Sequence, residues 1–391
     1  MRRYRSARPA ACLPDGGSAE SREEEARLVQ STAHEERPAP ARRRTGRRKA
    51  ALVGSGAAAG LLGLAALALP APYVVESPGP TFNTIGELRD QPLIEIPSRT
   101  TYPASGELDL TTVYVSGGPN APVTLLEVLS GWLDPARSVS PVELVYPPGT
   151  TGEQISEQNT AAMTSSQEAS VAAASSYLGV DYGQKLSVAG FADDSVSKGV
   201  LRVGDAIETV NGKAVTDIDV LRGELNASGG DAVDLGVRRG GERTKERIAP
   251  KANGQGVYQL GVVLSIDYSF PYQVKIQLDN VGGPRAGMMF ALGIVGKLTP
   301  GPMTGGRHFA GTGTIDAEGA VGPIGGIAQK MLGAARSGAT VFLAPEDNCG
   351  EVVGHVPEGM QVVKVSTLEE AVDAVTLIGQ GKDSSSLPSC G

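Results

Sequence analysis

The uncharged run from residue 50 to residue 75 constrains this chain more than any other feature. Residues 50–69 consist of Ala, Leu, Gly and Val with one Ser, and about twenty such residues are what the hydrocarbon core of a bilayer requires. A basic cluster, Arg-Arg-Arg-Thr-Gly-Arg-Arg-Lys, directly precedes the run at residues 42–49. Because Lys and Arg resist translocation, the pattern predicts one membrane span through residues 50–72, with a cytoplasmic N-terminus and extracytoplasmic domains.

Two other interpretations of this run remain open. Ala66, Leu67 and Ala68 form a small-x-small sequence that a signal peptidase would accept. The long basic leader and the full-length apolar run favour an uncleaved anchor instead. A buried helix of a soluble domain is disfavoured, because no polar stripe marks a face toward water.

Charge divides the chain into unlike parts. Residues 1–49 carry 13 of the 35 basic and 7 of the 43 acidic side chains, with few large apolar residues. Such a segment cannot bury enough surface to offset its ordering entropy, so we expect a disordered tail. The rest carries 22 basic and 36 acidic residues, which excludes a general nucleic-acid footprint. A length of 391 residues predicts two folded domains plus tails.

The stretch after the predicted span has mixed character. Residues 93–96 and 110–115 alternate and are β-branched, as strands are. Residues 123–132 and 157–177 have the apolar spacing or the Ala and Ser content of helices. We expect residues 73–173 to form an extracytoplasmic β/α region that leads into the next domain.

Three motifs follow one another in the C-terminal part: Gly-Gly-Pro-Arg-Ala-Gly at 282–287, Gly-Thr-Gly-Thr-Ile-Asp at 311–316, and Gly-Pro-Ile-Gly-Gly at 322–326 before Lys330. In their order and spacing they resemble the active site of Lon-type peptidases. The resemblance implies an α/β (α+β) Lon proteolytic fold over residues 258–378, followed by a tail, 379–391. It also implies a Ser-Lys dyad in which Lys330 is the general base, with Thr312 beside it, and assembly into a homo-oligomeric ring.

This chain departs from the resemblance at the nucleophile, where Arg285 replaces the serine. Strands at 260–266 and 274–278 and a helix at 286–295 would place residue 285 where a loop meets a helix, a position suited to an oxyanion. A guanidinium has no hydroxyl, so it cannot form an acyl-enzyme. Lys330 is expected in a helix at 329–337. Two cations in one partly buried site cost free energy, unless an acid such as Asp279 or Glu318 pairs with them or Arg285 turns toward solvent.

Other chemistries find little support in the sequence. His308 and His355 lie in no Gly-x-Ser-x-Gly context, and no His-x3-His or Cys-x2-Cys pair predicts a metal. Residues 293–297 lack the spacing of a phosphate loop, so neither ATP nor another cofactor is expected. Ser265 and Ser269 are most simply hydroxyls on a strand surface.

The pattern Leu-Arg-Val-Gly-Asp-Ala-Ile-Glu-Thr-Val-Asn-Gly at 201–212 resembles a bacterial PDZ domain, which we place at 174–252. The resemblance implies that Tyr177, Leu178, Gly179 and Val180 form a carboxylate-binding loop, because converging N–H groups can hold a peptide terminus. A helix at 215–225 would line the groove, and strands at 232–237 and 244–248 would close the sheet. Residues 73–83, Tyr-Val-Val-Glu-Ser-Pro-Gly-Pro-Thr-Phe-Asn, also resemble the membrane-anchored branch of the Lon family, which carries a PDZ domain and lacks an ATPase.

Cysteine placement agrees with the predicted topology. Cys349 and Cys390 fall in the exported part, where an oxidising compartment allows a disulfide, whereas Cys12 falls in the tail. Two free thiols are the alternative.

Three functions are then open. The first is a pseudopeptidase that binds exported polypeptides or peptide C-termini without cutting them. The second is an authentic ATP-independent endopeptidase. The third is a PDZ adaptor that delivers the tails of exported proteins.

Overall fold

The computed structural model describes residues 45–119, 121–278 and 283–391, with side chains from Lys49 onward. Residues 1–44 of the predicted disordered tail, with Cys12 and the first three arginines of the basic cluster, therefore lie outside the described residues, as do Asp279 and, in the first motif, Gly282. Residues 45–49, expected to be disordered, are helical. The chain divides into two units, the second of which begins at Gly63.

Helix α1 (Thr45–Leu67) contains the apolar run. Of the helices in the described part of the chain, it alone is long and apolar enough to cross a membrane, with a mean hydropathy of 1.9 over Lys49–Leu67. None of that window is buried. The helix ends five residues before the predicted limit of the span at residue 72, because Pro70 and Ala71 form strand β1.

A six-stranded mixed sheet, here the central sheet, organises the second unit. Its strand order is β22-β21-β18-β6-β2-β8. Strands β22, β21, β18 and β6 are parallel to one another, whereas β2 pairs antiparallel with β6 and β8. The bounds are β22 (Gln361–Val365), β21 (Val341–Pro345), β18 (His308–Gly311), β6 (Glu107–Gly117), β2 (Tyr73–Asn83) and β8 (Ser138–Pro141).

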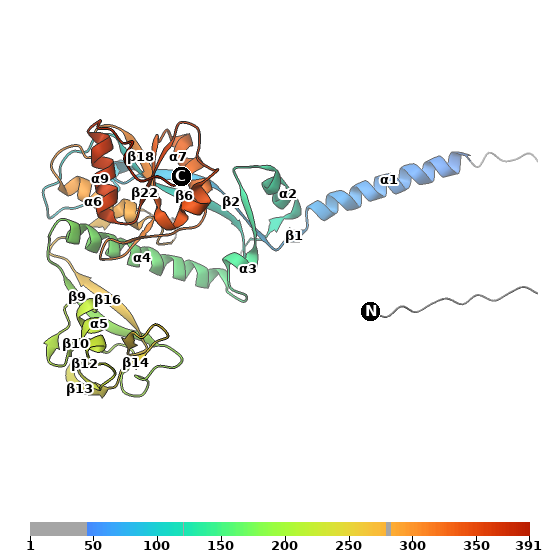
Figure 1. Ribbon diagram of the computed structural model, residues 1–391. Coiled ribbons are helices and arrows are strands. Elements are labelled where there is room, and N and C mark those ends of the chain that lie inside the picture. Colours follow the sequence, from blue (N-terminus) through green and yellow to red (C-terminus); the bar gives the residue numbers. More distant parts are fainter. Residues whose placement is uncertain (1–44, 120, 279–282) are drawn as a thin grey trace, which may run out of the picture. The chain divides into compact units, whose positions relative to one another are not determined.

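Helices cover both faces of the central sheet. Successive residues of β21 point to opposite faces of the sheet. Leu343 packs with α4, α6 and α9, whereas Phe342 packs with α7. Figure 1 shows α4, α6 and α9 near one another and α7 against β6 and β18. The bounds are α4 (Gly152–Tyr177), α6 (Gly287–Leu298), α7 (Ile327–Ser337) and α9 (Leu368–Gly379).

The structure draws the domain boundaries differently from the sequence prediction. Residues 73–173 do not form a separate region, because β2, β6 and β8 are half of the central sheet and α4 contributes to its core. The strand predicted to open the Lon-like domain at 260–266 instead belongs to another sheet, as β16 (Val262–Ser269). The second sheet is thus an insertion between α4 and α6.

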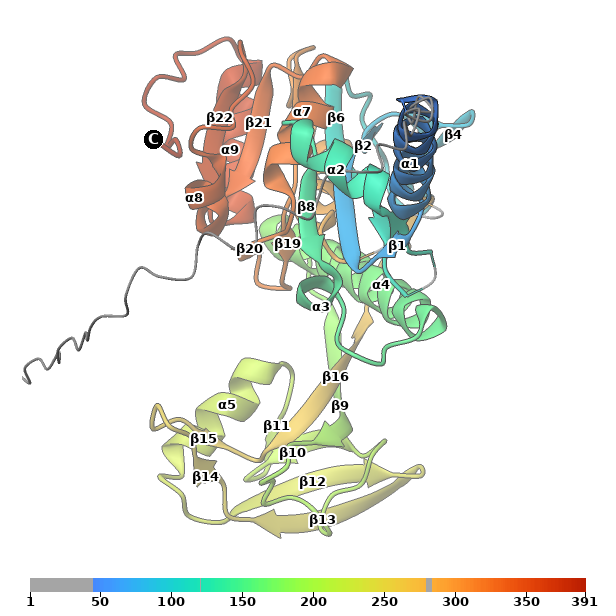
Figure 2. The ribbon, with the colours of Figure 1, turned by 90° about the vertical axis from the view of Figure 1, so that its right-hand side faces the viewer.

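We call residues 183–269 the inserted module. Its strands have the order β13-β12-β10-β9-β16, all antiparallel, with β11 added to β10. Helix α5 (Ile218–Ala227) buries Leu221 and Leu225 in the module's own apolar core. Figure 2 shows β9 and β16 as the long pair of strands at which the chain enters and leaves the module. The remaining bounds are β9 (Gly183–Phe191), β10 (Ala206–Val210), β11 (Lys213–Ala214), β12 (Val233–Arg239) and β13 (Glu242–Ile248).

Short elements complete the fold. The helix predicted at 123–132 is α2, and residues 93–96 and 274–278 contain the paired strands β5 and β17. These elements are β1 (Pro70–Ala71) with β7 (Val123–Thr124), β3 (Glu87–Leu88) with β4 (Gln91–Pro92), β5 (Ile94–Glu95) with β17 (Lys275–Ile276), β14 (Lys251–Ala252) with β15 (Tyr258–Gln259), β19 (Thr314–Ile315) with β20 (Val321–Gly322), α2 (Leu125–Leu133), α3 (Val142–Val145), a 3₁₀ turn (Glu346–Asn348) and α8 (Cys349–Val352).

Candidate functional site

Arg285 stands in the turn that leads into α6. The helix is apolar on all sides and buried from Gly287 to Gly296, which fixes its start rigidly. Two serines of α4 hold the turn: Ser166 donates to the carbonyl of Pro284 at 3.0 Å, and Ser170 donates to that of Gly287 at 2.9 Å. The Arg285 side chain is exposed, in agreement with the expected turn toward solvent, and no carboxylate of the described residues pairs with it; Asp279 lies outside those residues.

The backbone of Arg285 is tied to the second motif. Its carbonyl accepts hydrogen bonds from the N–H of Gly313 and from the hydroxyl of Thr312, both at 3.0 Å. The N–H of Met288, at the start of α6, donates to the carbonyl of Gly313 at 3.1 Å. The first two motifs therefore form one unit through the main chain, and the nucleophile position keeps a defined location.

Lys330 lies on the first turns of α7, directly behind that unit. Gly326 precedes the helix with φ 70°, a left-handed conformation that explains the last glycine of the third motif. Lys330 is 2% exposed, and its Nζ donates to Thr312 Oγ1 at 2.9 Å. The structure therefore brings Arg285, Thr312 and Lys330 together.

Burial, and to a smaller extent the nearby positive charge of Arg285, lower the pKa of Lys330 to about 7, whereas the charge of Glu76 acts in the opposite direction. A lysine with such a pKa can exist as a neutral amine near neutrality and could accept a proton. Glu76, on β2, was not anticipated from the sequence, which offered Asp279 or Glu318. Glu318 is exposed, and no motif marks Glu76, because only the pairing of β2 with β6 places it near α7.

A cavity of about 590 Å³ opens in front of these residues. It is lined by residues 111–115 of β6, by the start of α4 and the segment before it, and by Gly283, Arg285, Ala286 and Lys330. Among the described residues that line the cavity there is no serine and no cysteine. This stretch of β6 was predicted as a strand, but its position beside the site was not.

Thr312 does not replace the missing nucleophile. Its side chain is fully buried, and its hydroxyl already donates to the Arg285 carbonyl while it accepts from Lys330. Ser265 and Ser269 lie on β16 of the inserted module, where they pair with Ser187 and Gly183 of β9. These hydroxyls belong to another sheet, in agreement with their assignment as strand-surface groups.

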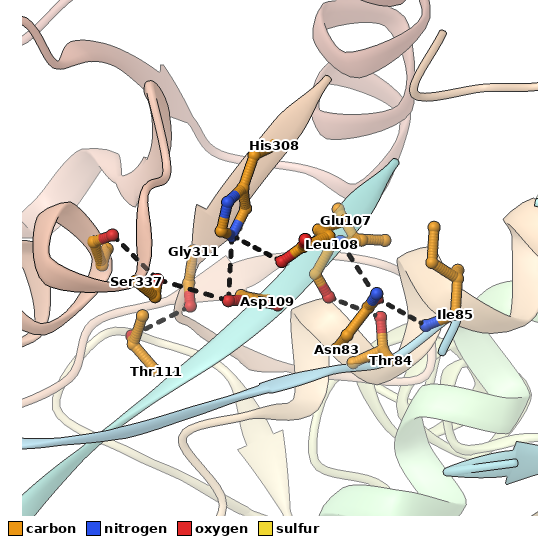
Figure 3. A network of polar contacts seen from close by, with 11 residues as sticks. Asn83, Thr84, Ile85, Glu107, Leu108, Asp109, Thr111, His308, Gly311 and Ser337 are labelled. Carbon is orange, nitrogen blue, oxygen red and sulfur yellow. Dashed lines mark hydrogen bonds and ion pairs between the residues drawn. The ribbon is translucent and has the colours of Figure 1, made fainter. Parts of the chain in front are cut away.

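A second polar cluster joins the first residues of β6 and β18 (Figure 3). His308 Nε2 lies 3.0 Å from Asp109 Oδ2 and 3.2 Å from Glu107 Oε2. The Ser337 hydroxyl is 3.4 Å from Asp109 Oδ2 and donates to the carbonyl of Ala334 at 2.8 Å. A hydrolytic triad needs the imidazole between the serine and the acid, whereas here the carboxylate lies between them, so the cluster does not supply a substitute catalyst.

Glu107, Asp109 and His308 are also the residues most suited to hold a cation in the described part of the chain. Their ligand atoms lie within 4.8 Å of one another. One imidazole nitrogen and two carboxylates form a donor set that divalent transition metals accept. None of the three lines the cavity at Lys330.

The expected carboxylate loop at Tyr177–Val180 is wrong. Tyr177 is the last residue of α4, and the N–H groups of Leu178, Gly179 and Val180 donate to the carbonyls of Ala174, Ser176 and Ser175 at 2.9–3.1 Å. Gly179 has φ 65°, which is typical of a glycine that ends a helix. Leu178 and Val180 pack against the core of the central sheet. Because these N–H groups are already bonded, they cannot converge on a peptide terminus.

Cys349 and Cys390 form a disulfide in the structure. Cys390 also packs beside the apolar cluster that contains Met331 and Ala334 of α7. The C-terminal residues are thus fastened behind the helix that carries Lys330.

Comparison with known proteins decides the family of the C-terminal part. Residues 280–378 match the Lon protease (S16) C-terminal proteolytic domain. The chain carries a Lon-like proteolytic domain. Three similar relatives are Lon protease 1 of Bacillus subtilis (29% identity over 205 residues; 48% of this chain, 26% of the relative), Lon protease of Clostridioides difficile (35% over 98; 24% and 12%) and Lon protease 2 of Herpetosiphon aurantiacus (39% over 93; 23% and 11%).

The chain thus spans about a quarter or less of the length of these curated relatives. Among solved structures, the PDZ domain of the SdrC-like protein from Listeria innocua is 20% identical and matches 20% of this chain and 92% of its own, with a TM-score of 0.20. A protein from Geobacillus thermodenitrificans is 18% identical and matches 20% of this chain and 94% of its own, with a TM-score of 0.19.

Proposed function

We propose that this protein is a membrane-anchored pseudopeptidase that binds extended polypeptides in its Lon-like cleft and does not cut them. One observation carries the proposal: Arg285 occupies the start of α6, beside an otherwise assembled Lys330–Thr312 pair. A guanidinium carries a permanent charge and no hydroxyl, so it cannot attack a carbonyl.

Loss of cutting does not imply loss of binding. The cavity in front of Lys330 retains about 590 Å³, and residues 111–115 of β6 line it. Strand β18 pairs with one edge of β6 over residues 107–110. Beyond Leu110, no described strand pairs with that edge. A free strand edge in a cavity can accept an extended peptide through backbone hydrogen bonds.

The inserted module would supply a second site for polypeptides. Its sequence pattern at 201–212 resembles PDZ domains, and its core and antiparallel sheet are complete without the rest of the chain. Strand β13, at one edge, is rich in charged residues, which discourage strand addition, whereas β16, at the other, carries the exposed apolar Val263. We therefore assign peptide contact to the β16 edge rather than to residues 177–180.

Helix α1 would anchor the protein in a membrane. Its leucines are exposed, with Leu52 71% and Leu62 72% accessible, and no polar face shields them. The basic residues before it would keep the N-terminus cytoplasmic. Protease added to intact cells should remove an epitope fused after Gly391 and spare one fused before Met1. The opposite protection pattern would reject this topology.

One observation favours the second candidate, an endopeptidase. A pKa near 7 is the property that a general base needs, and Lys330 has it although none of the described residues that line the cavity is a serine. The hydroxyls of Thr111, Thr112 and Thr150, which line the cavity, donate to backbone carbonyls. Catalysis would then require one of them to be released, or a nucleophile from residues outside the described ones.

A binding and integrity assay separates the two candidates. Full-length protein in detergent micelles should raise the fluorescence anisotropy of labelled, unfolded casein, and the casein should remain intact on a denaturing gel. The Lys330→Ala variant should still bind casein, because Lys330 is 2% exposed and offers a bound polypeptide little surface. If casein is cleaved by the wild type and spared by Lys330→Ala, the pseudopeptidase proposal is wrong and the endopeptidase is favoured.

A further inference from the structure

The free edge of β6 starts at a defined place, next to the Lon-like site. Strand β18 pairs with β6 as far as Gly311, opposite Leu110. Thr111 Oγ1 then donates to the carbonyl of Gly311 at 3.0 Å, which closes the pairing. A peptide that adds to β6 beyond this point is therefore stopped at Gly311 and cannot continue along the strand.

Arg285 lies at this stop. Thr312 directly follows Gly311, and its hydroxyl binds the Arg285 carbonyl at 3.0 Å. The Arg285 side chain is exposed and lines the same cavity as residues 111–115. Among the residues that the structure describes, no carboxylate lies within ion-pair distance of its guanidinium. Glu76, the acid of the cavity, acts instead on Lys330.

These charges select the direction of a bound peptide. A strand parallel to β6 would bring its N-terminal ammonium to the Arg285 guanidinium, which repels it. A strand antiparallel to β6 runs from Val115 toward Thr111 and brings its C-terminal carboxylate to the same place. A guanidinium binds a carboxylate through two parallel hydrogen bonds, which are among the stronger polar contacts in proteins.

We propose that the cleft holds the C-terminus of an extended peptide, antiparallel to residues 111–115 of β6, with its terminal carboxylate on the Arg285 guanidinium. The inference rests on the proposed function and makes it more specific. The residue that removes the nucleophile converts the cleft from one that accepts the middle of a chain into one that recognises its end. Tyr114 and Val115, 59% and 41% exposed, would contact the peptide upstream of that end.

A matched peptide pair tests this inference on the full-length protein in detergent micelles. The two peptides have one apolar sequence and one N-terminal fluorophore, and differ only in a free C-terminal carboxylate or a C-terminal amide. Charge-assisted hydrogen bonds correspond to an affinity difference of about 10- to 100-fold, so the acid should bind that much more tightly. Arg285→Gln should lower the affinity of the acid to that of the amide.

Controls locate the effect. Arg137→Gln removes the same charge from an exposed ion pair with Asp134 and should leave the preference unchanged. Thermal unfolding of Arg285→Gln should match the wild type, because the side chain is exposed.

Each contrary result has a separate meaning. Equal affinity for acid and amide in the wild type overturns the carboxylate site but leaves polypeptide binding intact. A preference that survives Arg285→Gln places the carboxylate elsewhere, such as the inserted module, and also overturns the inference. Failure of the wild type to bind any peptide or casein rejects the proposed function itself.

Discussion

The cleft at Lys330 and the chain segment at 178–180 differ in how their polar groups are satisfied. Lys330 is 2% exposed, and its ammonium, which has three donors, makes one hydrogen bond among the described residues, to Thr312. The N–H groups of Leu178, Gly179 and Val180 all donate to carbonyls of α4. The Lys330 ammonium is thus buried with donors that no described residue accepts, whereas every N–H group of residues 178–180 already has an acceptor.

This difference indicates where chemistry can occur. A buried ammonium with few partners has a lowered pKa and responds to its surroundings. A capped helix end has no comparable response, because its donors are already bonded. The capacity to hold a ligand therefore lies in the cleft and, by our proposal, at the free edges of β6 and β16, rather than at residues 177–180.

The largest test of this comparison is the stability of Lys330→Met. Below pH 7 the lysine is protonated in both the folded and the unfolded state, so its burial penalty is fully present. Between about pH 7 and its usual value of 10.5, the folded state has lost the proton and the unfolded state has not, so stability rises with pH. The slope from this group is at most about 1.4 kcal/mol per pH unit.

Urea unfolding between pH 6 and pH 10 should therefore show that Lys330→Met is more stable than the wild type by several kcal/mol at pH 6, and by less at pH 10. Lys382→Met, at an exposed position, should follow the wild type throughout. If Lys330→Met has the same pH slope as the wild type, the lysine is not buried as an ammonium.

The same contrast explains what could be predicted from the sequence. Arg285, Thr312 and Lys330 are far apart in sequence, yet their place in one site could be predicted from three glycine-rich motifs in a fixed order. Each motif encodes a local backbone shape, such as the left-handed conformation of Gly326. The hydrophobic-Gly-hydrophobic pattern at 178–180 is compatible with either a helix end or a carboxylate loop. Only the packing of Leu178 and Val180 against the central sheet decides between them.

Domain boundaries and contacts between distant segments could not be predicted, because no local sequence pattern encodes them. Strands β2 and β6 precede the inserted module by many residues, and nothing local reveals that they pair with β18 beyond it. For the same reason neither Glu76 nor the cluster of Glu107, Asp109 and His308 was anticipated. Helices with strong apolar patterns, such as α6 and α7, were predicted within a few residues of their bounds.

The disulfide stabilises the part of the fold that carries the cleft, because Cys390 packs beside α7. Cys349 and Cys390 are 41 residues apart, so loss of the bridge should lower the free energy of unfolding by about 4 kcal/mol. Cys390→Ser, Cys349→Ser and the double variant should lose equal amounts. In hydrogen exchange, α7 should lose more protection than β12. Additive losses from the two single variants would contradict the bridge.

The smallest expected effect concerns Gly179. A Cβ at this position would meet no atom within 4 Å, so Gly179→Ala tests only the left-handed backbone, at a cost of about 1 kcal/mol. Peptide affinity should not change, because the N–H groups here serve the helix. Gly183→Ala, which meets Ser269 at an ordinary 3.6 Å, should cost less stability. Peptide binding that weakens in Gly179→Ala without loss of stability would restore a binding role to this loop.

The most direct measurement is the reaction of position 285 with a serine-directed fluorophosphonate, read by mass spectrometry of the full-length protein. The wild type should remain unlabelled. Arg285→Ser should be labelled at position 285 and should begin to cleave casein, and Arg285→Ser combined with Lys330→Ala should lose both activities, because the hydroxyl then lacks its base. Labelling of the wild type at another residue, or a folded Arg285→Ser that stays inert, would contradict the claim that one residue separates this cleft from a peptidase.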